Sequence, residues 1–187
     1  MEEKGSEQFS DHFRIFPEDH GIIFKLLVYA IHDQENAEKL NLNLQKGIML
    51  TGPVGCGKTT LMKLIRFFQT QQEVYSVKSC REISFEFIAK GFEVIHKYST
   101  GENRKVYCFD DLGTEQNLKY YGNECNIMAE ILLNRYDQFI AHGTITHLTT
   151  NLSASEIESY YGNRVRSRMR EMFNVIAFNK ESKDKRR

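Results

Sequence analysis

Apolar and polar residues follow one another along this chain in blocks that predict strands and helices in turn. Short apolar runs typical of buried strands lie at 47–51, 74–77, 106–109, 144–150 and 175–178. Apolar residues with helical spacing predict helices over 22–31, 61–68, 82–97, 124–141, 153–160 and 163–172. Ser153 and Glu156 fit a capping box at the start of the helix over 153–160. Strands that alternate with helices form a parallel sheet with helices on both faces. The pattern therefore predicts an α/β fold, a three-layer sandwich.

The two ends of the chain are polar. Residues 1 to about 10 carry few apolar side chains, and we expect them to be mobile. From Asn179 onward nearly every residue is polar, and the segment closes with Lys185-Arg186-Arg187. This composition predicts a frayed tail, with a nucleic-acid contact as the alternative.

Composition sets limits on function. The 187 residues suit one domain, and 25 basic residues balance 25 acidic ones, so any contact with DNA must come from a local patch. No apolar run is long enough to cross a membrane, and the acidic N-terminus does not fit a signal peptide. The four cysteines form no C-x-x-C pair, and the histidines show no metal spacing. We expect a cytoplasmic protein with reduced thiols.

The segment 52–59 fits the phosphate-binding pattern G-x-x-x-x-G-K-[ST], and it lies between a predicted strand and a predicted helix, as that pattern requires. Its backbone N–H groups would surround the β- and γ-phosphates of a nucleoside triphosphate. Lys58 supplies a cation, and the Thr59 hydroxyl can ligate Mg²⁺. The residues expected to contact the nucleotide are Gly52, Pro53, Val54, Gly55, Cys56, Gly57, Lys58, Thr59 and Thr60.

A second acidic site follows the strand at 106–109. Asp110 and Asp111 close that strand, and hydrolysis needs one carboxylate for Mg²⁺ and one to orient the attacking water. We assign Asp110 to the metal and Asp111 to the water. The alternative is an Asp-rich turn that only ends the strand.

Two polar features come later in the chain. Asn151 ends another strand, where its amide would bond the γ-phosphate or the lytic water, unless it only starts a turn. The segment 161–170 carries four arginines at alternate positions. On a helix, Arg164 and Arg168 lie on one flank of an apolar stripe. From that position they can reach the γ-phosphate of a neighbouring molecule, as an arginine finger does. The alternative is a basic helix that only faces solvent.

Arg135 is the exception in the helix at 124–141, because it falls within the apolar stripe of that helix. A buried charge must be paired or must serve a site. An ion pair with a strand-end carboxylate and a role linked to the nucleotide or to a subunit interface are the two interpretations.

With these motifs in order, the chain resembles the AAA+ ATPases of the DnaC/IstB group, which are helicase loaders and transposition helper ATPases. The matching segments are 52–59, 109–113, 134–136, 149–151 and 161–169, with Gly-x-Arg-x-x-Ser-Arg-Met in the last as the most specific. The resemblance covers roughly 45–178. It divides the chain into an N-terminal segment, 1–44, with a helix packed on the core, an AAA+ P-loop ATPase domain, 45–178, and a polar basic tail, 179–187.

This resemblance implies a five-stranded AAA+ sheet, ATP and Mg²⁺ as cofactors, and ATP hydrolysis as the activity. It implies Lys58, Asp111, Asn151 and Arg168 as catalytic residues, with Asn151 as sensor 1 and Arg168 as the arginine finger. It also implies a homo-oligomer and, as partners, a replicative helicase or a transposase. Two departures are expected: only about 45 residues precede the P-loop strand, and the AAA+ core has no C-terminal lid and no sensor 2 arginine.

Two further functions stay open on sequence alone. A P-loop phosphotransferase acting on a small molecule would use the arginines of 164–170 in a substrate lid. A nucleotide-gated binding module would use ATP as a switch. The loop 118–121 carries Tyr120 and Tyr121, whose rings would stack on single-stranded DNA if the loop is more than an ordinary exposed turn.

Overall fold

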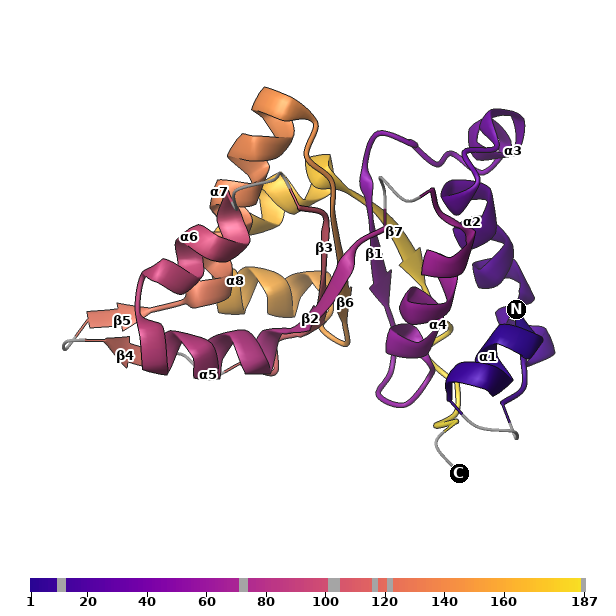
Figure 1. The fold of residues 1–187 in the computed structure, drawn as a ribbon, viewed down its shortest axis with the longest axis horizontal. Coiled ribbons are helices and arrows are strands. Elements are labelled where there is room, and N and C mark those ends of the chain that lie inside the picture. Colours follow the sequence, from indigo (N-terminus) through magenta and orange to yellow (C-terminus); the bar gives the residue numbers. More distant parts are fainter. Residues whose placement is uncertain (10–12, 71–73, 101–104, 116–117, 121–122, 186–187) are drawn as a thin grey trace.

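The computed structural model describes residues 1–9, 13–70, 74–100, 105–115, 118–120 and 123–185, with the backbone but not the side chains of 118–120 and 123–125. A five-stranded sheet lies between two groups of helices (Figure 1). Every strand pair in it is parallel. Its strands stand in the order β2 (Ser76–Ser79), β3 (Tyr107–Leu112), β6 (Thr146–Thr150), β1 (Gly47–Thr51) and β7 (Phe173–Ala177). The α/β class and the parallel five-stranded sheet are confirmed.

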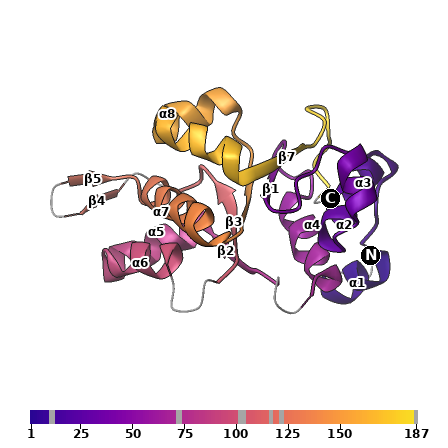
Figure 2. The ribbon, with the colours of Figure 1, turned by 90° about the horizontal axis from the view of Figure 1, so that it is seen from above.

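Helices cover both faces of this sheet (Figures 1 and 2). One face packs against α5 (Cys80–Lys90), α6 (Glu93–Ser99), α7 (Ile127–His142) and α8 (Ala154–Met172). The other packs against α2 (His20–Ala30) and α4 (Lys58–Ile65), and α3 (Gln34–Lys39) packs on α2. Successive residues of a strand point to opposite faces, so Cys108 joins the core under α2 and α4, whereas Phe109 joins the core under α5 to α8.

The remaining elements are short. One 3-10 helix, η1 (Pro17–Asp19), precedes α2, and another, η2 (Arg66–Phe68), follows α4. An antiparallel hairpin pairs β4 (Leu118–Tyr120) with β5 (Asn123–Cys125). Tyr121, one of the two tyrosines proposed for DNA stacking, lies outside the described residues. No helix in the described part of the chain is long and apolar enough to cross a membrane. Cys56, Cys80 and Cys108 are free thiols and buried.

The order of the strands places three strand ends next to one another. Because parallel strands share a direction, their carboxyl ends meet at one edge of the sheet, where ligands of such folds bind. β6 lies between β1 and β3, so the loop after β1, Asp110 and Asp111 of β3 and Asn151 after β6 come together at that edge.

Both polar ends of the chain are more ordered than their composition predicts. Residues 2–8 form helix α1 (Glu2–Gln8), and the Glu2 carboxylate accepts a hydrogen bond from the Ile15 N–H at 2.8 Å. In the tail, the Lys185 N–H donates to the Gly55 carbonyl at 3.0 Å, and its ammonium bonds the Asp19 carboxylate at 2.5 and 2.6 Å. The composition of the two ends did not predict helix α1 or the contacts of Lys185.

Glycines mark the other differences from the expected helices. The helix expected over 82–97 is two helices, because Gly91 has a φ of 63° and ends α5. The helices expected at 153–160 and 163–172 are confirmed as two arms of α8, joined at Gly162 with φ 83° and ψ 161°. The capping box predicted at Ser153 and Glu156 is present. The predicted apolar stripe of the second arm is buried, and it comprises Val165, Met169 and Met172.

Arg135 is 1% exposed, and the ion pair with a strand-end carboxylate that the sequence suggested is not formed. Its guanidinium donates to the Thr146 hydroxyl at 2.8 Å and to the carbonyls of Lys105 and Ile145 at 3.0 and 2.7 Å. These acceptors lie where β3 and β6 begin, at the edge of the sheet opposite the P-loop. Burial lowers the pKa of the guanidinium to about 10. The side chain therefore ties α7 to two strands through oxygen acceptors, and not through an ion pair with a strand-end carboxylate.

Candidate active site

The loop between β1 and α4 has the form that phosphate binding requires. Gly57 stands just before α4 with a φ of 102°, and Gly55 has a φ of 80°, two left-handed conformations that glycine adopts without strain. A side chain at Gly55 would also collide with the Asp184 carboxylate, 2.2 Å from the position of its Cβ. The loop therefore turns tightly into α4, whose N-terminal N–H groups attract anions.

Lys58 lies under this loop and is 5% exposed. Its ammonium donates to the carbonyls of Gly52 at 2.9 Å and Pro53 at 2.8 Å. The loop backbone thus satisfies the cation while it faces the cavity. A phosphate group bound there would bring acceptors of full negative charge, which form stronger hydrogen bonds with an ammonium than neutral carbonyls do.

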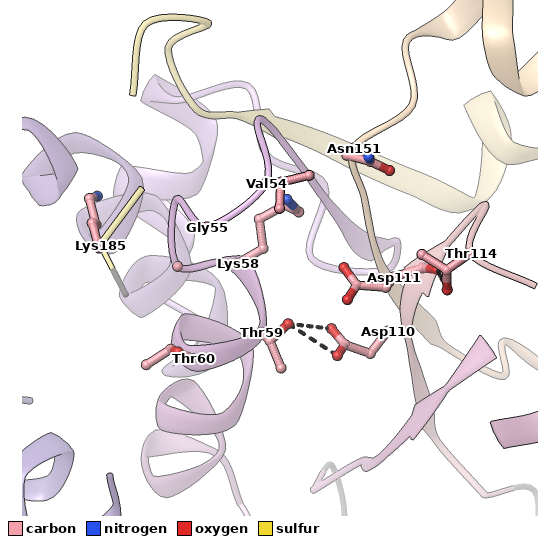
Figure 3. Close-up of a pocket in the computed structure, with 11 residues that line it drawn as sticks. Val54, Gly55, Lys58, Thr59, Thr60, Asp110, Asp111, Thr114, Asn151 and Lys185 are labelled. Carbon is pink, nitrogen blue, oxygen red and sulfur yellow. Dashed lines mark hydrogen bonds between the residues drawn. The ribbon is translucent and has the colours of Figure 1, made fainter. Parts of the chain in front are cut away.

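The next residue joins the two motifs found in the sequence. The Thr59 hydroxyl lies 2.9 and 3.0 Å from the two carboxylate oxygens of Asp110, across the gap between α4 and β3 (Figure 3). A hydroxyl and a carboxylate that meet at one point are hard oxygen ligands of the kind Mg²⁺ accepts. Among the described residues there is no cluster of three His, Cys, Asp or Glu side chains that would form a complete metal cage.

Asp111, Thr114 and Asn151 line the same cavity, which has a volume of about 520 Å³ (Figure 3). Asp111 has a φ of 55°, unusual for a residue other than glycine. The Thr114 hydroxyl donates to the Asp111 carbonyl at 2.7 Å. Asn151 follows the last residue of β6 and is exposed. The lining of the cavity therefore combines the ammonium of Lys58, the carboxylates of Asp110 and Asp111, and the amide of Asn151.

Most residues proposed from the sequence line this cavity. They are Val54, Gly55, Gly57, Lys58, Thr59, Thr60, Asp110, Asp111 and Asn151. Gly52 and Pro53 contribute instead the carbonyls that hold Lys58. Cys56 turns into the core, 1% exposed, and burial raises the pKa of its thiol. Its contribution to binding would come from its backbone alone.

Arg168 does not line the cavity in its own chain. It lies on the second arm of α8, with its guanidinium 4.6 Å from the centre of the Tyr136 ring and 3.9 Å from an Asp137 carboxylate oxygen. Arg166 pairs with Glu158. Among the described residues no arginine lines the cavity.

Two lining residues were missed by sequence reasoning. Thr114 follows Gly113 in the loop after β3, and its place one turn beyond the acidic pair is the signal that was available. Lys185 reaches the cavity from the tail, and its ammonium also lies 5.2 and 5.3 Å from the centres of the Phe16 and Phe178 rings. The basic composition of the tail was the available signal for Lys185, and it could not locate the side chain, because the contact depends on tertiary structure.

A loop of P-loop form after the inner strand β1 and an acidic strand end on β3 lie at one edge of a parallel sheet, which is the arrangement of the P-loop NTPase fold. Comparison of the sequence with protein-family models and with curated proteins finds no match. Comparison of the structure finds proteins of DNA replication. The DnaC helicase loader has a TM-score of 0.60 at 18% identity, over 90% of this chain and 94% of that one.

Two further structures share the fold. DnaI gives a TM-score of 0.58 at 17% identity, over 96% of this chain and 95% of that one. DnaA from Aquifex aeolicus, bound to AMPPCP, gives 0.58 at 16% identity, over 90% of this chain and 49% of that one. These proteins are AAA+ ATPases, so the resemblance seen in the sequence is confirmed at the level of the fold.

Proposed function

We propose that this protein binds ATP with Mg²⁺ and hydrolyses the γ-phosphate, as an AAA+ ATPase. The observation that carries the proposal is the contact between Thr59 and Asp110. It joins the first turn of the P-loop helix to the acidic end of β3, in a cavity that Lys58, Asp111 and Asn151 also line. The fold shared with DnaC, DnaI and AMPPCP-bound DnaA supports it.

Each residue has a role that its position allows. The loop N–H groups and Lys58 would hold the phosphates, and Thr59 and Asp110 would hold the metal, which would supply positive charge there. Asp111 accepts a hydrogen bond from the attacking water and orients it, and the Asn151 amide donates to the γ-phosphate or the water. Because phosphoryl transfer depends mainly on positioning and charge, these roles need no covalent intermediate.

The test of hydrolysis is Asp111→Asn, with Lys58→Ala as the comparison. Asp111→Asn should bind a fluorescent ATP analogue like wild type and lose about 10²- to 10⁴-fold in turnover, since a positioned acid or base contributes that much. Lys58→Ala should lose nucleotide binding. Unchanged phosphate release by Asp111→Asn would refute the role of Asp111.

We further propose that Arg168 acts on the nucleotide of a neighbouring protomer. Its absence from the cavity of its own chain and its place on the surface of α8 support an action in trans. Arg168→Ala should therefore bind ATP normally and turn over at least about 10³-fold more slowly, as loss of an arginine finger does. Arg170→Ala, an exposed arginine two residues further along α8, is the matched control.

A mixing experiment separates action in trans from action in cis. Arg168→Ala has an intact nucleotide site, and Lys58→Ala has an intact arginine, so an equimolar mixture should regain activity that neither has alone. Turnover per protomer of wild type should also rise with protein concentration. An inactive mixture together with a rate independent of concentration would show that the protein works as a monomer.

The biological role we propose is to load or remodel a DNA-associated complex, with a replicative helicase or a transposase as partner. The fold shared with the DnaC and DnaI loaders and with DnaA bound to AMPPCP and single-stranded DNA supports this role. Affinity capture with Asp111→Asn in the presence of ATP should retain such a partner, and Lys58→Ala should not. Stimulation of turnover by single-stranded DNA would identify DNA as a direct ligand.

The phosphotransferase alternative has no observation in its favour, because the arginines of 164–170 do not form a lid over the cavity. ADP formation that requires an added metabolite would nevertheless favour it over hydrolysis.

A further inference from the structure

β3 does not enter the site as a regular strand. It pairs with β6 through Phe109 opposite Leu148 and through Leu112 opposite Thr150, with a shift of register between these pairs. Two residues of β3, Asp110 and Asp111, therefore stand opposite a single residue of β6, Thr149. Two residues that oppose one form a β-bulge, which is rare in parallel sheets and redirects the side chains of the bulged strand.

The bulge explains how two successive aspartates serve one site. In a regular strand, neighbouring side chains point to opposite faces of the sheet, so only one of the pair would reach the cavity. Here both Asp110 and Asp111 line it (Figure 3). The left-handed φ of 55° at Asp111 is the backbone distortion that brings the second carboxylate round.

The Thr149 hydroxyl contacts both residues of the bulge. It donates to the Asp110 carboxylate at 2.7 Å and accepts from the Asp111 N–H at 2.9 Å. Thr150 contacts the residue beyond, since its hydroxyl donates to the Leu112 carbonyl at 2.8 Å and accepts from the Leu152 N–H at 3.0 Å. Both threonines are 0% exposed, so water cannot replace either hydroxyl.

We propose that Thr149 is a positioning residue for ATP hydrolysis: its hydroxyl holds the bulge that presents Asp110 to Thr59 and turns Asp111 into the same cavity. The proposal rests on the function proposed above. Without this hydroxyl, the Asp111 N–H loses its acceptor on β6, and the Asp110 carboxylate loses the hydrogen bond from Thr149 while it keeps the one from Thr59. The strand would then relax toward regular geometry, and Asp111 would swing away from the cavity.

The test uses changes that separate the hydroxyl from the shape of the side chain. Thr149→Val keeps the shape and removes the hydroxyl, and Thr149→Ser keeps the hydroxyl. Thr144→Val is the matched control, because the Thr144 hydroxyl is buried near the start of β6 and has no hydrogen-bond partner among the described residues.

Thr149→Val should lower kcat by about tenfold to a hundredfold, as loss of a group that orients a metal ligand does, and should raise the Mg²⁺ concentration needed for tight nucleotide binding. The other two variants should stay within about twofold of wild type. If Thr149 served only the fold, Thr149→Val would lower the melting temperature. At temperatures well below the melting temperature, kcat and the Mg²⁺ requirement would then be unchanged.

A second readout does not depend on catalysis. In the nucleotide-free protein, hydrogen exchange in a peptide covering 109–113 should be faster in Thr149→Val and unchanged in Thr149→Ser, because the Asp111 N–H loses its acceptor. If exchange, kcat and the Mg²⁺ requirement of Thr149→Val all match wild type, the proposal is wrong.

The two proposals fail in different ways. If hydrogen exchange is faster in Thr149→Val but the wild-type protein does not hydrolyse ATP, the role of Thr149 in holding the bulge stands and the proposed ATPase function is refuted. If Thr149→Val does not fold, Thr149→Cys, in which a weakly hydrogen-bonding thiol replaces the hydroxyl, must show the same direction of change.

Discussion

We predict that His147 makes the stability of this protein sensitive to acid. The ring lies on β6, beside the P-loop strand, and is 2% exposed. Its Nδ1 accepts a hydrogen bond from the Ile48 N–H at 3.1 Å, which requires the neutral ring. The rings of Tyr29 and Tyr75 pack against it, with centres 5.7 and 4.5 Å away. Burial and, to a smaller extent, the Arg135 cation lower its pKa from 6.5 to about 3.

The sign and size of the effect follow from this pKa. Well above pH 6.5 neither the folded nor the unfolded chain protonates His147, so its full contribution to stability is present. As pH falls below 6.5 the unfolded chain gains a proton that the folded chain refuses until about pH 3. The loss in free energy of unfolding is about 1.4 kcal/mol at pH 5.5 and about 2 kcal/mol at pH 5.0, a large share of the roughly 5–15 kcal/mol of a typical domain.

The assay is urea unfolding at pH 7.5, 6.5, 5.5 and 5.0 for wild type and His147→Asn. The Asn amide oxygen can occupy the position of Nδ1 and accept from Ile48, but it does not titrate. The variant should be less stable at pH 7.5, because it leaves a cavity, and the difference from wild type should shrink by about 2 kcal/mol at pH 5.0. Parallel pH profiles of the two proteins would refute the reasoning.

Three further predictions concern buried polar contacts. Arg135→Met should cost about 2–4 kcal/mol of stability, because two carbonyls lose their donor, and should leave nucleotide affinity of the folded protein unchanged; weaker affinity would revive a nucleotide-linked role. Lys185→Ala should cost about 1–3 kcal/mol by leaving Asp19 without its cation, and Asp19→Asn should recover part of it in a double-mutant cycle, with additive effects counting against the pair. Tyr161→Phe should cost about 1–2 kcal/mol in urea unfolding through loss of the hydrogen bond to Glu115, and an unchanged midpoint would contradict this.

The features that the sequence predicted correctly are local ones. Apolar runs mark the inner strands β1, β3 and β6, because both faces of these strands are covered. The edge strand β2 is only half-buried, and it begins at Ser76 and not at residue 74 as predicted. The P-loop is read from eight adjacent residues, and the capping box at Ser153 and Glu156 from four. Gly91 had the same kind of signal, since a glycine inside a helical pattern often ends the helix, and it went unused when 82–97 was expected to be one helix.

The features that the sequence did not predict depend on contacts between distant segments. Asp19 and Lys185 are 166 residues apart, and no local pattern indicates that they pair. The polar composition of the tail predicts a frayed end because each residue alone has little apolar surface to bury. The structure nevertheless gives Lys185 an ion pair with Asp19 and a backbone hydrogen bond to Gly55 of the P-loop.

Arg135 and Thr149 show why the role of a buried polar residue cannot be assigned from sequence. Both lie in stretches that predict a buried helix face or strand, and the need for a partner is certain in each case. The identity of the partner decides between structure and function. Arg135 bonds carbonyls at the edge of the sheet away from the cavity, whereas Thr149 bonds a carboxylate that lines it. The same chemical requirement is therefore structural at one end of β6 and, as we propose, catalytic support at the other, because the nucleotide would lie only at the carboxyl end of the strands.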